Sequence, residues 1–473
     1  MVYFFTVMAS VLFMMWSYYF VKTYQLCGYK IKNFCKALFN FDLAFGDKNK
    51  LIFTKRIIRF YILFFLIGAG LLFLNYYFVY SVFLVLLNTV VVFIILPLIM
   101  IVAHYLLLPF EILIKKFYMA KAKRKLARKQ NLIKVAITGS YGKTSTKNIL
   151  TAMLEKEYKV CATPKNFNTE MGLTKTILEN LDDHDVLVAE FGARKKGDIE
   201  ILTKMLNPEY AILTTIGNQH IETFKTLKAI EQTKNELPLN MKADGIVVFN
   251  GDSNSTRKLY DECTIQKFLV CDEKGFAKAR NIEIGEDGSK FELVLDGKPM
   301  KVQTKLLGRC NINNIVSASA MAHILGITNK DIVSAINTLE PTPHRLELIK
   351  NNYCTIIDDA YNSNLIGAKE AMEVLSKFKG RKIVVTPGFV EMGAEQSNSN
   401  FTLGGMIADV ADYIIIMNNI NKNEIFSGAI SHNFDRNKIH FAQSRSRQKE
   451  IISLLTCEGC VILFENDLPD NYK

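Results

Sequence analysis

One short stretch, residues 133–145, constrains the fold of this 473-residue chain more than any other feature. An apolar run rich in β-branched residues ends at Thr138-Gly139, and a segment with helical spacing begins at Lys143 and runs to about Lys156. A strand, a glycine-bearing turn, a Lys-Thr pair and a helix are typical of a loop that surrounds phosphate. The glycines let the backbone approach the anion, and amides at the helix start point toward it. The stretch therefore predicts a phosphate site, in which Lys143 reaches the terminal phosphates and the Thr144 hydroxyl binds magnesium.

The match to the usual phosphate-loop pattern is incomplete, because Ile137 stands where the first glycine is expected. The alternative interpretation is a glycine turn before an ordinary helix. A second predicted strand, residues 185–190, favours the phosphate interpretation because it ends on Glu190. Ligands of parallel sheets bind at the carboxyl ends of the strands, where a carboxylate can hold magnesium. The alternative for Glu190 is a charged strand end in solvent.

Further polar residues follow predicted strands or lie on predicted helices. His220 comes after the strand predicted over 210–216, where it could contact a metal or a phosphate, although a single histidine is more often structural. Lys234 lies on the helix predicted over 226–236, and the alternative is an ordinary solvated lysine. Residues 164–172 form an Asn-rich loop, which predicts either hydrogen bonds to a polar substrate or a simple turn.

The front of the chain contains two long runs without charged residues. Residues 1–21 carry no Asp, Glu, Lys, Arg or His, and residues 60–110 carry none except His104. One helical crossing of a membrane needs about 20 apolar residues. We therefore expect a three-helix transmembrane region over residues 1–110, with spans at about 1–21, 58–79 and 82–108. A cleaved signal peptide is the alternative for the first run, but no basic segment or clear cleavage site supports it.

The net charge of +12 is concentrated beside these runs. Residues 22–59 hold nine Lys/Arg against two Asp, and residues 111–130 hold eight Lys/Arg against one Glu. Basic flanks stay on the cytoplasmic side. The pattern predicts a multi-pass protein of the bacterial plasma membrane with a basic juxtamembrane linker over 111–130 and its catalytic domains in the cytoplasm. No aromatic residues alternate with the charges, so we expect no nucleic-acid partner, and the sequence leaves the oligomeric state open.

Residues 131–473 alternate β-branched runs with helical segments, which is the pattern of α/β folds. We expect a central parallel-sheet domain like a P-loop ATPase over 131–340, with an antiparallel insertion over 255–305. A Rossmann-like α/β domain is expected over 341–473, after a hinge at Pro341 and Pro343. The chain has nine cysteines, and because most of them lie in this predicted cytoplasmic part, free thiols are expected. The Cys457-Glu-Gly-Cys460 pair has no second pair at zinc spacing, so a structural role is favoured over a metal or redox role.

Eight motifs in residues 131–473 occur in the order found in the Mur ligase family, which the chain resembles. They are Thr138–Ser145, Asn166-Phe-Asn168, Glu190-Phe-Gly192, Ile216-Gly-x-x-His220, Lys234-x-Glu236, Gly308-Arg-x-Asn311-x-x-Asn314, Arg345-Leu-Glu347 and Ile357-Asp-Asp-Ala-Tyr-Asn-Ser-Asn364. The resemblance implies an ATP-dependent, ADP-forming amide ligase of peptidoglycan precursor synthesis that acts through an acyl phosphate. The Asp358-Asp359 and Glu391-Met-Gly393 stretches are similar to those of the members that join D-alanyl-D-alanine to a UDP-N-acetylmuramoyl-tripeptide.

The resemblance also implies roles for individual residues. It implies catalytic roles for Lys143, Glu190, His220 and Lys234. It implies nucleotide contacts for Gly139, Ser140, Tyr141, Gly142, Lys143, Thr144, Ser145, Asn250, Asn311, Asn314, Arg345 and Asp359. It implies substrate contacts for Asn166, Asn168, Thr169, Tyr361, Asn362 and Asn364. Two Mg²⁺ sites are implied, one on Thr144 and Glu190, the other on His220 and a carbamylated Lys234, whose pKa must be lowered by burial because only a neutral amine is carbamylated.

The sequence departs from the family in several places. Cys310, Ala360 and Leu365 replace the usual His, Ser and Pro, and residues 465–470 replace a Lys-Gly-Ser segment. Membrane spans are expected where these ligases carry a small domain that binds the UDP-sugar. Two alternatives therefore stay open. One is the same chemistry on a lipid-linked or poly-γ-glutamate acceptor, and the other is a membrane scaffold that binds nucleotide without reaction.

Overall fold

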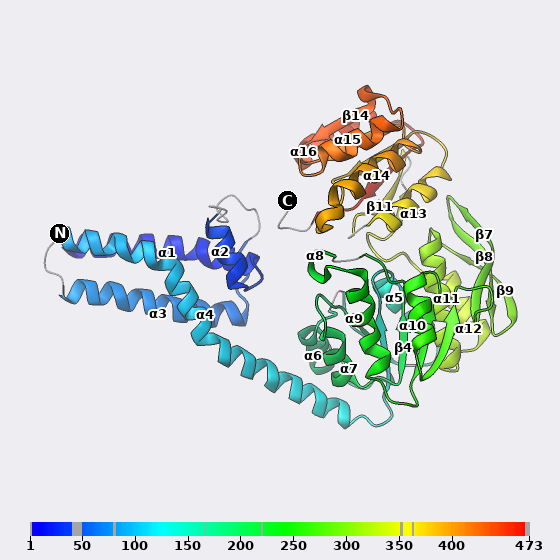
Figure 1. The fold of residues 1–473 in the computed structure, drawn as a ribbon, viewed down its shortest axis with the longest axis horizontal. Coiled ribbons are helices and arrows are strands. Elements are labelled where there is room, and N and C mark those ends of the chain that lie inside the picture. The colour runs from blue at the N-terminus through cyan, green and yellow to red at the C-terminus, as the bar shows by residue number, and fades with distance from the viewer. Residues whose placement is uncertain are drawn as a thin grey trace. The chain divides into compact units, whose positions relative to one another are not determined.

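We analysed the protein as a computed structural model, which describes residues 2–39, 50–78, 82–165, 167–218, 221–350, 353–361 and 364–468. The chain forms two compact units, Met1–Tyr118 and Met119–Lys473 (Figure 1). The first unit is helical and the second is α/β. Three residues singled out by the sequence, Asn166, His220 and Asn362, lie outside the described residues.

The first unit is built from helices with an aromatic core. Its elements are α1 (Val2–Leu26), α2 (Ile31–Phe39), α3 (Lys55–Phe78) and the first part of α4 (Val82–Ala127). The Tyr24 ring stacks on Phe60 with centroids 4.6 Å apart, and its hydroxyl lies 2.5 Å from His104 Nδ1. At the same end of the unit, Arg59 Nη2 lies 2.6 Å from a Glu111 carboxylate oxygen. The polar side chains thus form two pairs within the unit, Tyr24 with His104 and Arg59 with Glu111.

The helices coincide with the three predicted spans, but the three-span region is not confirmed. Among the described residues, one helical segment has the length and composition to cross a membrane, Ile94–Ala127. The basic segment predicted as a linker is helical up to Ala127, because α4 continues through it. That segment is rich in Ala, Lys and Leu, which are strong helix formers, and it contains no Gly or Pro after Pro109. The last turns of α4 lie in the second unit, where Ala122 and Leu126 are buried in its core.

A nine-stranded sheet forms the first half of the second unit, in the order β2-β3-β1-β4-β5-β6-β7-β8-β9. The strands are β1 (Ile133–Thr138), β2 (Val160–Ala162), β3 (Val186–Glu190), β4 (Tyr210–Leu213), β5 (Ile246–Asn250), β6 (Gln266–Val270), β7 (Ala277–Gly285), β8 (Gly288–Leu295) and β9 (Lys298–Thr304). Strands β1 to β6 pair in parallel, and β7, β8 and β9 form an antiparallel meander. The predicted central parallel sheet is confirmed.

Helices cover both faces of this sheet (Figure 1). They are α5 (Lys143–Leu154), α6 (Glu170–Glu179), α7 (Asp198–Leu206), α8 (Ile221–Phe224), α9 (Leu227–Leu239), α10 (Asn254–Glu262), α11 (Arg309–Ile324) and α12 (Asn329–Asn337). Because successive strand residues point to opposite faces, Val135 and Ile137 of β1 pack with α5, α11 and α12, whereas Ala136 packs with α6, α7, α9 and α10. Both faces of β1 are thus buried, and its carboxyl end is the natural place for a ligand.

The antiparallel insertion is shorter than predicted. Only residues 277–304 are antiparallel, whereas α10 and β6 extend the parallel sheet. The start of α10 explains the difference, because the Ser253 hydroxyl accepts a hydrogen bond from the Thr256 amide at 3.2 Å and so caps a helix.

A six-stranded sheet forms the second half of this unit, in the order β10-β11-β15-β12-β13-β14. The strands are β10 (Glu347–Lys350), β11 (Cys354–Asp359), β12 (Lys382–Thr386), β13 (Tyr413–Met417), β14 (Ile439–Ala442) and β15 (Cys460–Glu465). The helices between them are α13 (Leu365–Ser376), α14 (Gln396–Ala408), α15 (Lys422–Ser431) and α16 (Arg445–Leu455). Only the β10–β11 pair is antiparallel. The remaining pairs are parallel, as expected for a Rossmann-like α/β layout.

Candidate active site

The glycine loop between β1 and α5 has the backbone that the sequence predicts. Gly142 is the residue before α5 and has φ of 80°, in the left-handed region where a side chain would be strained. A Cβ there would also collide with the Asn314 side chain. The Ser140 hydroxyl donates to the Gly217 carbonyl at 3.0 Å and accepts from the Gly217 amide at 3.1 Å. The loop is therefore fixed against the segment that follows β4.

Lys143 turns its ammonium back over this loop. Nζ donates to the carbonyl oxygens of Gly139 at 2.9 Å and Ser140 at 2.7 Å. The pKa of Lys143 is lowered to about 8, mainly by burial; Glu190 opposes this shift and Arg345 adds to it. A buried cation of this kind is stabilised by an anion. The loop thus has the charge and the backbone that a phosphate group requires.

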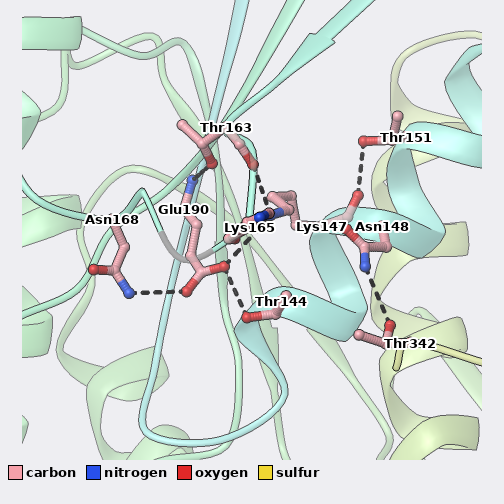
Figure 2. Close-up of polar contacts among 9 residues, drawn as sticks. All are labelled: Thr144, Lys147, Asn148, Thr151, Thr163, Lys165, Asn168, Glu190 and Thr342. Atoms are coloured by element: carbon pink, nitrogen blue, oxygen red, sulfur yellow. Dashed lines mark hydrogen bonds and ion pairs between the residues drawn. The ribbon is translucent and has the colours of Figure 1, made fainter. Parts of the chain in front are cut away.

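Glu190 is the central carboxylate of the site, as Figure 2 shows. Its side chain is 2% exposed, so the alternative of a strand end in solvent is wrong. Oε2 accepts a hydrogen bond from the Thr144 hydroxyl at 2.9 Å, and Oε1 accepts one from Asn168 Nδ2 at 3.1 Å. The Glu190 backbone N–H donates to the Thr163 hydroxyl at 3.0 Å. Three predicted site residues, Thr144, Asn168 and Glu190, therefore meet at one point.

Lys147 is a member of this cluster that the sequence interpretation missed. Its ammonium donates to the carbonyl oxygens of Thr163 at 2.7 Å and Lys165 at 3.0 Å, and it lies 3.7 Å from Glu190 Oε2 (Figure 2). The side chain is 3% exposed. One signal could have found it: Lys147 comes one helical turn after Lys143, so both project from the same side of α5.

Lys234 of α9 is buried at 3% exposure, as a carbamylated lysine would require. Burial, followed by the charge of Lys143, lowers the pKa of Lys234 well below its usual value, against the attraction of Asp198, Glu190 and Glu236. Glu236, two residues on, accepts hydrogen bonds from the amides of Gly197 at 2.8 Å and Glu200 at 3.1 Å. It therefore caps the start of α7 rather than facing the phosphate loop.

The three predicted nucleotide asparagines have different surroundings. Asn314 Oδ1 accepts a hydrogen bond from the Thr146 hydroxyl at 3.1 Å, which places it beside the glycine loop. Asn311 Nδ2 donates to the Leu307 carbonyl within its own helix segment. Asn250 ends β5, and its buried Nδ2 has no hydrogen-bond partner among the described residues. A buried amide without a partner is costly, so a ligand acceptor at Asn250 would fit.

Arg345 and Asp359 lie together after the predicted hinge. The Arg345 guanidinium carbon is 4.5 Å from the centre of the Tyr361 ring. Asp359 Oδ1 accepts a hydrogen bond from the Leu346 amide at 3.1 Å. Burial raises the pKa of Asp359 to about 6, although Arg345 opposes the shift. The charge of Arg345 lowers the pKa of Lys143, and the charge of Glu190 raises the pKa of Arg345. The two halves of the second unit therefore contribute charged residues to one site.

Two of the predicted substrate residues act as helix caps. The Thr169 hydroxyl accepts from the Gly172 amide at 3.3 Å at the start of α6, and Asn364 Oδ1 accepts from the amides of Ile366 and Gly367 at the start of α13. Their side chains therefore have a structural task, and their substrate contacts stay a prediction. Cys310, the replacement for the usual His, has a backbone amide that donates to Glu370 at 3.0 Å.

Comparison with known proteins agrees with this geometry. Residues 137–322 match the family model described as the Mur ligase middle domain. The matched region contains the glycine loop, Glu190 and Lys234. This part of the chain is a Mur ligase middle domain. The family indicated by the eight sequence motifs is thus confirmed.

Curated relatives carry the name UDP-N-acetylmuramoyl-tripeptide–D-alanyl-D-alanine ligase. The protein of Bacillus subtilis is 27% identical over 335 residues, which are 70% of this chain and 72% of the relative. The protein of Buchnera aphidicola (strain Bp) is 32% identical over 300 residues, 63% of each chain. The protein of Escherichia coli is 29% identical over 276 residues, 57% of this chain and 61% of the relative. The chain therefore spans under two thirds of the length of the latter two.

Solved structures support the fold. MurF ligase of Thermotoga maritima in complex with ADP has a TM-score of 0.68 and 25% identity, covering 75% of this chain and 80% of that one. MurF of Acinetobacter baumannii has a TM-score of 0.69 and 24% identity, covering 75% of this chain and 77% of that one. The α/β architecture of the Mur ligases is therefore shared by this chain.

Proposed function

We propose that this Mur ligase is an ATP-dependent, ADP-forming amide ligase that joins D-alanyl-D-alanine to a UDP-N-acetylmuramoyl-tripeptide in peptidoglycan precursor synthesis. One observation carries the proposal: the Thr144 hydroxyl and the Glu190 carboxylate meet at 2.9 Å beside a glycine loop whose carbonyls bind the Lys143 ammonium. The names of the relatives supply the substrates. They do not favour a lipid-linked or poly-γ-glutamate acceptor, nor a scaffold without chemistry.

The residues present fit a magnesium ion. Magnesium binds oxygen ligands in an octahedron at about 2.0–2.1 Å, so two neighbouring ligands lie about 2.9 Å apart. Thr144 Oγ1 and Glu190 Oε2 are separated by 2.9 Å. These two residues would hold the ion. When bound, magnesium neutralises charge on the phosphate oxygens during phosphoryl transfer.

The reaction proceeds in two steps in this proposal. The γ-phosphoryl group of ATP passes to the terminal carboxylate of the tripeptide, which gives ADP and an acyl phosphate. The amine of D-alanyl-D-alanine then attacks the acyl carbon, the C–O bond to phosphate breaks, and the amine loses a proton. Phosphoryl transfer needs positioning and charge neutralisation more than covalent help from the protein. Lys143 and Arg345 supply positive charge for this, because both are half-buried cations of the same site.

A second metal site on His220 and a carbamylated Lys234 is part of the proposal. Carbamylation requires a neutral amine, and the lowered pKa of Lys234 supplies one. Bicarbonate dependence of turnover, with rescue of Lys234→Ala by a short carboxylic acid, would support it. A Lys234→Ala enzyme with unchanged turnover would contradict it.

We also propose that the first unit anchors the enzyme in the plasma membrane, with the α/β unit in the cytoplasm. The support is the charge-free composition of residues 1–21 and 60–110, the candidate span Ile94–Ala127, and the Lys/Arg-rich flanks. Fractionation of the full chain tests it. Recovery in the soluble fraction without detergent would contradict the anchor and leave the ligase proposal intact.

The ligase proposal is tested with the purified full chain, ATP, Mg²⁺, the UDP-linked tripeptide and D-alanyl-D-alanine. We expect release of ADP and phosphate that depends on both substrates, and a product mass equal to the sum of the two minus water. No amine-dependent phosphate release with any UDP-linked muropeptide would overturn it.

A further inference from the structure

Lys147 makes a second connection between α5 and the acceptor loop, beside the one that Glu190 makes through Thr144, Thr163 and Asn168. It projects from α5, the helix that follows the glycine loop, and its ammonium reaches residues 163–165 between β2 and α6 (Figure 2). That segment leads directly to Asn168 and Thr169, the residues predicted to face the acceptor. Lys147 is therefore placed between the nucleotide loop and the acceptor loop.

The ammonium has two backbone hydrogen-bond acceptors and one carboxylate at ion-pair distance. A lysine ammonium carries three donors and no acceptor. The Thr163 carbonyl at 2.7 Å, the Lys165 carbonyl at 3.0 Å and Glu190 Oε2 at 3.7 Å surround it. Both charged side chains are buried, at 3% and 2% exposure. Each of these two buried charges is compensated by the other, and removal of one would leave the other uncompensated.

The backbone of the acceptor loop needs such a partner. Lys165 has φ of 48°, a left-handed conformation that is unfavourable for a residue with a side chain. Its carbonyl is one of the two that bond Lys147. Further along, the Phe167 amide donates to the Pro164 carbonyl at 3.0 Å, and the Asn168 carbonyl accepts from the Gly192 amide at 2.8 Å. The strained turn is thus held at Lys147 on one side and at the end of β3 on the other.

We propose that Lys147 is a positioning residue of the reaction. It fixes the described residues of the acceptor loop, 163–165 and 167–169, against Glu190 and α5, and so aligns the acceptor carboxylate with the nucleotide phosphate. The proposal rests on the function proposed above for the choice of acceptor, but the contacts that carry it do not depend on that choice.

Hydrogen exchange of the full chain without nucleotide or magnesium is the direct test. In Lys147→Met, which keeps an unbranched side chain but removes the charge, the amides from Phe167 to Gly172 should exchange at least about 10-fold faster than in the native chain. The matched control is Lys156→Met, which removes a lysine just after the same helix whose ammonium makes one exposed contact with Ser334. The control should exchange like the native chain. Unchanged protection of the loop in Lys147→Met would overturn the proposal.

A second variant answers the objection that an unpaired buried Glu190 could unfold the protein. Lys147→Met combined with Glu190→Gln removes both charges together. If Lys147 holds the loop through the two carbonyls, the double variant should exchange fast at the loop, whereas Glu190→Gln alone should exchange like the native chain. Equal exchange in the double variant and in Glu190→Gln would contradict the positioning role.

Kinetics distinguish positioning from a general structural effect. In Lys147→Met we expect KM for the UDP-linked tripeptide to rise and kcat to fall by about 10- to 100-fold together, because a small misplacement of a reactant costs this much. Binding of ADP in magnesium-free buffer should stay near the native value, since Lys143 and the glycine loop are unchanged. Equal losses in ADP binding and acceptor KM would overturn the proposal. If the native chain itself fails with this acceptor, the proposed function falls, and the exchange experiment still decides on Lys147.

Discussion

The carboxyl edges of the two sheets in the second unit are built in different ways. The edge of the nine-stranded sheet gathers charged groups, with the half-buried Lys143 and the buried Lys147 and Lys234 near the buried carboxylate of Glu190. The edge of the six-stranded sheet after β12 is held mostly by asparagine amides, and Asn400, Asn421 and Asn466 are all buried there. Charges that are buried beside a glycine loop can act on a ligand, whereas amides that bond the backbone shape a loop.

The amides of the second edge are fully used by the protein. Asn400 accepts from the Phe389 amide at 2.8 Å and donates to the Phe389 carbonyl at 3.0 Å and the Gln396 carbonyl at 2.8 Å. Asn421 donates to the carbonyls of Pro387 and Phe389, each at 3.0 Å. The comparison therefore predicts that changes at the first edge reduce turnover and that changes at the second reduce stability.

Replacing Lys143 should give the largest loss of turnover, and it tests whether the first edge is the catalytic one. Lys143→Ala removes the buried cation beside the phosphate loop, so we expect turnover to fall by at least about 10³-fold, the scale found for groups that stabilise charge in a transition state. Urea unfolding should change little, because a desolvated ammonium is removed. Steady-state phosphate release measures the first effect. Native turnover in this variant would show that the first edge is not the catalytic one.

The sequence predicted the first edge better than the second. Lys143, Thr144 and Glu190 could be predicted because each stands at a strand end or a helix start, and those positions can be recognised locally. Lys147 was missed because its hydrogen-bond partners are two backbone carbonyls of residues 163–165. Every residue has a backbone carbonyl, so the sequence does not indicate which ones will bind a lysine. The second edge was missed because Asn400 and Asn421 come from separate helices and meet only in the folded sheet. In the first unit, the helices were predicted, but the continuation of α4 through the basic segment was not, since charge was taken as a sign of a linker.

Asn400→Ala tests the second edge by stability. The substitution removes three hydrogen bonds and leaves the Phe389 N–H and C=O without their partner, so the free energy of unfolding should fall by about 3 kcal/mol. Turnover per folded molecule should change by less than about 3-fold, because no contact with the phosphate loop is lost. Urea denaturation and active-site titration measure the two quantities. Asn398→Ala, an exposed neighbour on the same helix, is the control and should behave like the native chain. Lost turnover with native stability would reverse the assignment of the two edges.

Asp359 sharpens the comparison, because it is a buried charge on β11 of the second sheet. Its pKa is raised by burial to about 6, above the usual 3.8. The folded protein therefore holds this proton more tightly than the unfolded chain, and stability from this group is present at low pH and is lost as pH rises from about 4 to about 6. Asp359→Asn cannot ionise. Because one pKa unit corresponds to about 1.4 kcal/mol, the stability of the native chain relative to Asp359→Asn should fall by about 3 kcal/mol over that range and then stay constant. Urea unfolding of both proteins from pH 4 to 8 checks this, and a relative stability that rises over the same range would show that Arg345 dominates.

Glu236→Ala should give the smallest change in stability and leave the affinity for ADP unchanged. It tests whether the charged edge of the first sheet includes Glu236. Glu236 lies two residues from Lys234, yet its carboxylate accepts from the amides of Gly197 and Glu200 at the start of α7. We therefore expect the loss of a helix cap, about 1 kcal/mol of unfolding free energy, and no change in the affinity for ADP. Glu236→Gln keeps one accepting oxygen and should lose about half as much. Thermal and urea unfolding measure the stability, and equilibrium binding measures the ADP affinity. A large loss of ADP affinity with native stability would place Glu236 in the nucleotide site and would extend the charged edge from Glu190 to α7.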